Sequence, residues 1–210
     1  MGVFGNNDHM NTANADAREH GFAPQTDYYD SLVVRLVPST PERDVDDTEA
    51  VFYDLPAQGW YPGEIRQHLR ETANKAPIQN YVLKERSTEV NWGASGGGLE
   101  IILQVASSIA DETIPVIVGA ALDQLLTRTR RRRQTSGFTD QDAAVRYVKW
   151  RISLGYGEGQ DQLHVLEVEL DDTQAARIIL AGSKGKRYEC TCSQTKGGLT
   201  MTRVKVTYTE

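Results

Sequence analysis

Residues 93–133 constrain the fold more than any other part of this chain. A glycine-rich turn at 93–98 leads into the most apolar stretch of the sequence, which ends at a block of arginines. Acidic residues and Pro115 interrupt this stretch, and it contains no run of about eighteen apolar residues, the length that a membrane-spanning helix needs. The sequence therefore predicts two short helices in residues 93–134 rather than one membrane span.

The predicted helical hairpin has its break next to Thr113. Polar side chains recur at helical spacing from Glu100 to Asp111, which predicts the first helix. Thr113 followed by Pro115 is typical of a helix start, and the second helix is predicted to run to about Arg128. We expect its apolar face to mediate self-association or partner binding through Ile114, Ile117, Val118, Ala121, Leu122 and Leu125.

The segments before the hairpin predict a small α/β unit. Residues 1–27 are rich in Asn, Asp, Ala and Gly, so they are interpreted as a flexible arm. Residues 28–92 are expected to form a strand–helix–strand unit, because β-branched runs flank a segment with a proline at its first helical position. The expected strands cover 29–37, 51–55 and 81–92, and the expected helix covers about 62–74.

The C-terminal third has a different periodicity. Residues 135–144 are interpreted as a linker, and from Val145 onward apolar and polar residues alternate. This period of two, with glycine-rich turns between the runs, predicts an antiparallel β-meander of about five strands over 145–210. Its first strand is expected at 148–154. The complete pattern predicts an α+β fold.

Composition bears on compartment and partners. The 210-residue chain has a net charge of −6, which argues against a general nucleic-acid binder. Cys190 and Cys192 are its only cysteines, which favours a reducing compartment. Residues 1–27 lack a secretory signal pattern, so we expect a cytoplasmic protein.

The arginine block predicts contacts with anions. One hypothesis is a membrane-targeting effector of the bacterial conflict or defence type, which would use residues 93–133 to engage anionic lipid at the membrane periphery. Phosphates of nucleic acid are an open alternative at the same cluster. The candidate anion-binding residues are Arg128, Arg130, Arg131, Arg132 and Arg133.

The glycine-rich turn carries a second hypothesis. Residues 93–97 read G-A-S-G-G and lie between a predicted strand and a predicted helix. Over these five residues the chain resembles the nucleophile elbow of the α/β-hydrolases. The resemblance implies a serine hydrolase with Ser95 as nucleophile and His164, the one histidine after it, as base. The antiparallel pattern downstream argues against that fold, and the same glycines could instead bind phosphate.

Metal and cofactor chemistry are not expected. Cys190 and Cys192 form a C-x-C pair without a second pair, which predicts two small buried side chains. His9, His20 and His68 lack metal-ligand spacing, and His68 is expected on the exposed side of its helix. We therefore favour a non-enzymatic interaction or assembly protein that forms a homo-oligomer or binds a protein partner.

Overall fold

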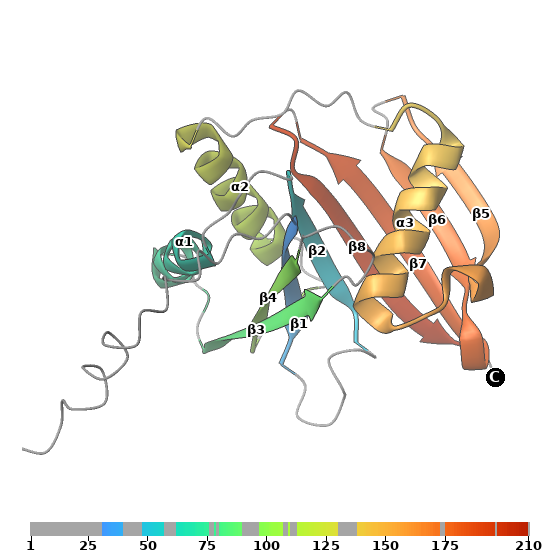
Figure 1. The fold of residues 1–210 in the computed structure, drawn as a ribbon, viewed down its shortest axis with the longest axis horizontal. Helices are drawn as coiled ribbons and strands as arrows, with labels where there is room; N and C mark the ends of the chain where they lie inside the picture. Colours follow the sequence, from blue (N-terminus) through green and yellow to red (C-terminus); the bar gives the residue numbers. More distant parts are fainter. Residues whose placement is uncertain are drawn as a thin grey trace, which may run out of the picture.

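The structure is a computed structural model. The residues that form strands and helices in it confirm the predicted α+β class, with eight strands and three α-helices in the described part of the chain (Figure 1). The described residues are 31–39, 48–56, 62–75, 78, 80–89, 97–106, 109, 113–129, 138–172, 175–195 and 197–209.

The eight strands form one sheet in the order β3-β4-β1-β2-β8-β7-β6-β5. Neighbouring strands are antiparallel, except that β1 and β4 are parallel. The β2–β8 pairing joins the N-terminal strands to a C-terminal meander, which agrees with the meander predicted there. The strands are β1 Ser31–Pro38, β2 Ala50–Leu55, β3 Tyr81–Glu89, β4 Gly97–Val105, β5 His164–Leu170, β6 Ala176–Ala181, β7 Lys186–Gln194 and β8 Thr200–Tyr208.

The helices cover opposite faces of the sheet. They are α1 Pro62–Lys75, α2 Thr113–Arg128 and α3 Gln141–Tyr156, and two short 3-10 turns follow at Gln160–Gln162 and Ser183–Gly185. Helices α1 and α2 pack on the N-terminal strands, and α3 packs on the other face, mainly against the C-terminal strands (Figure 1). Successive side chains of a strand point to opposite faces, so β1 and β2 contribute to both hydrophobic cores.

Tyr53 of β2 fixes the position of α2 on the sheet. Its hydroxyl donates a hydrogen bond to the Pro115 carbonyl over 2.7 Å. One turn later, a Cβ atom on Gly119 would lie 3.3 Å from the Tyr53 ring. The helix therefore rests closely on this ring, and burial raises the pKa of the tyrosine well above its ordinary value.

Gly155 allows the last turn of α3 to approach the sheet. A Cβ atom at this position would lie 2.7 Å from Cζ of Phe52, whose side chain is completely buried. The Gly155 carbonyl accepts a 3.1 Å hydrogen bond from Nη1 of Arg35. The Arg35 guanidinium is also buried and lies 5.1 Å from the Phe52 ring and 5.0 Å from the Tyr156 ring, so cation–π contacts compensate for its burial.

Gly155→Ala is expected to lower the free energy of unfolding by up to about 2 kcal/mol. Displacing the buried Phe52 ring costs about 1–3 kcal/mol, and the roughly 1 kcal/mol that alanine gains over glycine in helix propensity offsets part of this cost. Chemical denaturation measures the difference. In a Phe52→Leu background, which removes the close contact, the same substitution should cost less. An equal cost in both backgrounds would contradict the steric explanation.

The prediction of a first helix in the hairpin, ahead of α2, is wrong. Residues 97–105 form β4, which lies between β3 and β1, and residues 107–108 and 110–112 lie outside the described residues. Both faces of the central strand β4 are largely covered, so it reads as a continuous apolar run whose periodicity does not distinguish strand from helix. The second predicted helix is confirmed as α2.

The prediction of a strand at 148–154 is also wrong, because these residues belong to α3. Val148 and Ile152 fit an alternating pattern, but they also lie four residues apart on the buried stripe of a helix. The ends of α3 identify it. Asp140 caps its first turn by accepting a 2.7 Å bond from the Ala143 amide, and Gly157 ends it with a left-handed φ of 70°. Part of the predicted linker 135–144 is therefore helical.

Candidate functional site

The six apolar residues predicted to mediate association divide into two groups. Four of them are buried in the core that α1 and α2 form with the sheet, with exposed fractions of 8% or less: Ile114, Val118, Leu122 and Leu125. Ile117 and Ala121 are only half-buried and line a groove between α1 and α2. The widest apolar face of α2 is thus covered by the protein's own sheet, and the accessible surface lies beside it.

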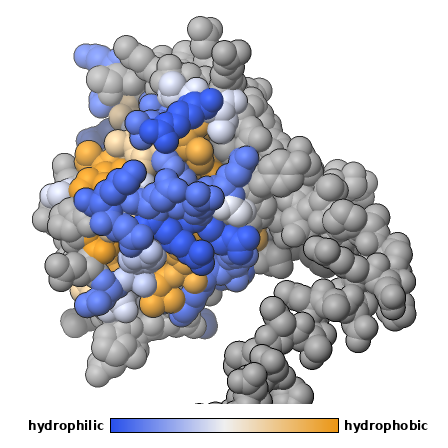
Figure 2. Space-filling model, turned by 90° about the vertical axis from the view of Figure 1, so that its left-hand side faces the viewer, coloured by the Kyte–Doolittle hydropathy of each residue, from blue (hydrophilic) through white to orange (hydrophobic). Residues whose placement is uncertain are grey.

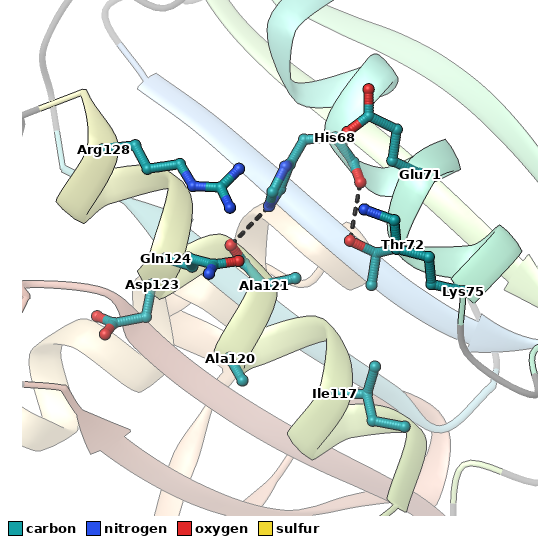
Figure 3. A pocket seen from close by; sticks show the side chains of 10 residues that line it. All are labelled: His68, Glu71, Thr72, Lys75, Ile117, Ala120, Ala121, Asp123, Gln124 and Arg128. Atoms are coloured by element: carbon teal, nitrogen blue, oxygen red, sulfur yellow. Dashed lines mark hydrogen bonds between the residues drawn. The ribbon is translucent and has the colours of Figure 1, made fainter.

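The groove between α1 and α2 has a volume of about 720 Å³ (Figure 3). Ile117, Ala120 and Ala121 of α2 supply its apolar lining. His68 of α1 connects the two helices, because its Nε2 donates a 2.8 Å hydrogen bond to the Ala121 carbonyl. The prediction that His68 lies on the exposed side of its helix was wrong, since the ring is half-buried and points toward α2.

Charges of both signs border this groove. Glu71 and Lys75 come from α1, and Arg128 comes from the end of α2 (Figure 3). Asp123 also contributes to the lining, but one of its carboxylate oxygens accepts a 3.0 Å hydrogen bond from Thr195 in the turn between β7 and β8. The groove thus combines an apolar centre with acidic and basic groups, which is a surface suited to a polypeptide segment.

The outward face of α2 adjoins the groove and exposes apolar surface. Val116 is 60% exposed, and Ala120 and Gln124 follow it at intervals of four residues on the same exposed stripe. From Thr113 to Leu122 the helix carries no charged side chain on any side. Figure 2 looks onto the side of the molecule where α1 and α2 lie, and hydrophobic atoms reach the surface there around a hydrophilic centre.

Of the two residues of the predicted hydrolase site, the structure describes only His164. Ser95 lies outside the described residues, but Gly97, two positions later, begins β4. His164 begins β5 at the far edge of the sheet, six inter-strand steps from β4 and about 29 Å away at 4.8 Å per step. The motif also leads into a strand, so the helix that a nucleophile elbow or a phosphate site requires does not follow it.

Of the predicted anion-binding residues, the structure describes only Arg128, which is exposed at the C-terminal end of α2. Arg130, Arg131, Arg132 and Arg133 lie outside the described residues. Binding of anionic lipid or of nucleic acid at this cluster therefore stays a prediction.

The two cysteines lie on the α3 side of β7 and are completely buried. Burial raises the pKa of Cys192 to about 12 and moves that of Cys190 further above its ordinary value. Both thiols are therefore protonated at neutral pH and shielded from reagents. No group of three or more His, Cys, Asp or Glu side chains that could hold a metal ion occurs in the part of the chain that the structure describes.

A buried polar network connects α3 to the sheet. Nη2 of Arg151 donates a 2.6 Å hydrogen bond to Oδ1 of Asp54, and the Tyr147 hydroxyl donates to Oδ2 of the same carboxylate. Thr202 extends the network to Tyr147 and to the Cys192 sulfur. Burial raises the pKa of Asp54, while Arg151 and Tyr147 act in the opposite direction. No sequence pattern predicted this network, and its one signal in the sequence is an aspartate within the apolar strand 51–55.

Glu158 is a second buried carboxylate, with 5% of its surface exposed. It accepts hydrogen bonds from the Ser183 amide and hydroxyl, over 3.2 and 3.0 Å, and from the Tyr188 hydroxyl over 3.0 Å. Burial alone would raise the pKa of Glu158, but these donors outweigh it and hold the pKa below its ordinary value. Glu158 thereby ties the end of α3 to the turn between β6 and β7.

Glu158→Gln is expected to cost about 1–3 kcal/mol of stability at pH 7, because charged acceptors form the stronger hydrogen bonds. Since the folded state lowers the pKa, the contribution of the carboxylate is present above the unfolded pKa of about 4.3 and is lost as the pH falls further. Urea unfolding at pH 7 and at pH 3 should therefore show a difference between the two proteins that shrinks in acid. The exposed Asp161→Asn serves as control and should change stability by less than about 0.5 kcal/mol.

Comparison with protein families, with curated proteins and with solved structures gives no match for this chain. Within the described residues, none of the helices has the length and apolar character needed to cross a membrane. The fold and its surfaces are therefore the basis for any functional proposal.

Proposed function

We propose that this chain is a non-enzymatic interaction protein that docks a helical protein partner on α2 and in the adjoining α1–α2 groove. The observation that carries the proposal is the outward face of α2 over residues 113–122, which has no charged side chain and where Val116 is 60% exposed. A helical stretch that lacks charge on all sides is ordinarily buried on all sides. In this fold the sheet covers only one side of α2.

The groove supports the same proposal through its composition. An amphipathic helix docks in an apolar groove through side chains at helical spacing, and charged rims fix its orientation. Ile117, Ala120 and Ala121 provide the apolar centre, and Glu71 and Lys75 lie on the α1 side of the groove. Because both signs of charge are present, a partner with mixed charge fits this surface better than a uniformly anionic one.

Cysteine labelling tests whether this surface is covered in the cell. Ala120→Cys places a thiol at the centre of the exposed stripe, whereas the two native thiols are buried. We expect a maleimide to label this thiol several-fold more slowly in the cells that make the protein than in the dilute purified chain. Arg146→Cys is the control, since Arg146 is exposed on α3, which packs on the opposite face of the sheet from α2 (Figure 1). Because cellular thiols also consume maleimide, the labelling rate at position 120 is taken relative to the rate of this control in the same setting. An equal ratio in cells and in dilute protein would refute the docking surface.

A further inference from the structure

The exposed stripe of α2 has a small residue at its middle, which suits pairing with a copy of itself. Val116 forms one end of the stripe, Ala120 its middle and Gln124 the other end. The small Ala120 side chain, with Ala121 beside it, allows the backbone of a second helix to approach closely. If a two-fold axis passes through Ala120, position 116 of each helix faces position 124 of the other, so each exposed valine meets the less apolar end of the partner's stripe.

The charges select the direction of such a pairing. Arg128 lies eight residues after Ala120, or about 12 Å along the helix axis. In an antiparallel pair the two Arg128 side chains are about 24 Å apart along the axis, which exceeds the Debye length of about 10 Å at ordinary ionic strength. In a parallel pair they would lie at the same height and repel each other. Antiparallel pairing therefore avoids the like-charge contact.

The balance of charge also favours a copy of this chain over a lipid surface or nucleic acid. Two acidic groups, Glu71 and Asp123, and two basic groups, Lys75 and Arg128, border the groove. A lipid surface or nucleic acid would bring phosphate close to Glu71, whereas a second copy brings charges of both signs. We propose that the chain forms a two-fold symmetric dimer in which α2 packs antiparallel on α2 of the second copy, centred on Ala120. The dimer rests on the proposed function, because it uses the same docking surface.

Sedimentation velocity of the full chain tests the dimer. We expect a concentration-dependent species of twice the monomer mass. Val116→Arg should weaken self-association at least about tenfold, because it buries a charge without a partner. Leu154→Arg on α3 is the matched control, since Leu154 is also an exposed apolar residue, at 40%, and should leave the dimer unchanged. A chain that stays monomeric at all concentrations overturns the dimer, as does a dimer that Val116→Arg does not weaken.

Disulfide trapping tests the antiparallel geometry. Val116→Cys chains mixed with Gln124→Cys chains should give the mixed disulfide as the main product, because positions 116 and 124 face each other about the axis. A majority of Val116→Cys homodimers would indicate a parallel pair and overturn the proposal. The buried native cysteines do not interfere.

The two proposals fail in different ways. If the purified chain is monomeric while the thiol at position 120 is still protected in cells, the proposal of a dimer is overturned and the proposal of a docking surface stands. If the thiol is equally accessible in cells and in dilute protein, both proposals are overturned.

Discussion

Asp54→Ala is expected to lower the free energy of unfolding by about 3–5 kcal/mol, the usual cost of breaking a buried ion pair from one side. Arg151 is 2% exposed and would remain charged without its carboxylate. The Tyr147 hydroxyl would also lose its acceptor. Urea unfolding followed by circular dichroism measures the loss. If the alanine variant does not fold, Asp54→Asn, which retains an acceptor for Tyr147, supplies the comparison at a smaller cost.

An exposed ion pair in the same protein provides the control. Arg66 and Glu85 lie 2.8 Å apart, but their side chains are 40% and 38% exposed. Glu85→Ala should therefore cost less than about 1 kcal/mol. A double variant with Asp54→Ala and Arg151→Met should recover part of the loss, because it also removes the unpaired charge. Equal costs for Asp54→Ala and Glu85→Ala would contradict a structural role for the buried pair.

Leu122→Ala is expected to cost about 2–5 kcal/mol, because it leaves a cavity in the core beneath α2. Leu122 is completely buried between α2, α1 and the sheet. Denaturation of dilute protein measures the effect on the chain itself, separate from any association. We expect this loss of stability because the Leu122 side chain points into the core. From the sequence alone, Leu122 belongs to the same apolar face as residues that reach the surface.

Val116→Ala on the exposed side of the same helix is the matched control. Val116 is 60% exposed, so in dilute protein its truncation should change stability by no more than about 0.5 kcal/mol. The two variants thus separate the face of α2 that holds the fold together from the face proposed to bind a partner. Similar losses for both variants would mean that the outward face is not free for docking.

The sequence by itself determined the elements whose ends or periodicity are unambiguous. Helix α2 follows from Thr113 and Pro115 at its start, and strands β5 to β8 follow from alternating residues between glycine-rich turns. In these segments the local signals agree with the final structure, because each residue's preference is satisfied within its own element.

Tertiary structure decided the segments whose pattern fits two periods. Residues 100–105 read as part of a helix, but they belong to the central strand β4 because β1 and β3 supply hydrogen bonds on both sides. Residues 148–154 read as a strand, but they belong to α3, which has a cap at each end. In both segments apolar side chains stand where either element would bury them, so the apolar pattern alone does not select one. The neighbours β1 and β3 select the strand, and the capped ends of α3 select the helix.

Tertiary structure also decided which side of α2 is free. The sequence assigns Leu122 and Ile117 to one apolar face, but the sheet buries the first and leaves the second in the groove beside α1. The pairing of Asp54 with Arg151, 97 positions later in the chain, has no local signal either. Local sequence determines which residues share a face of an element, whereas packing between distant elements determines which face remains exposed.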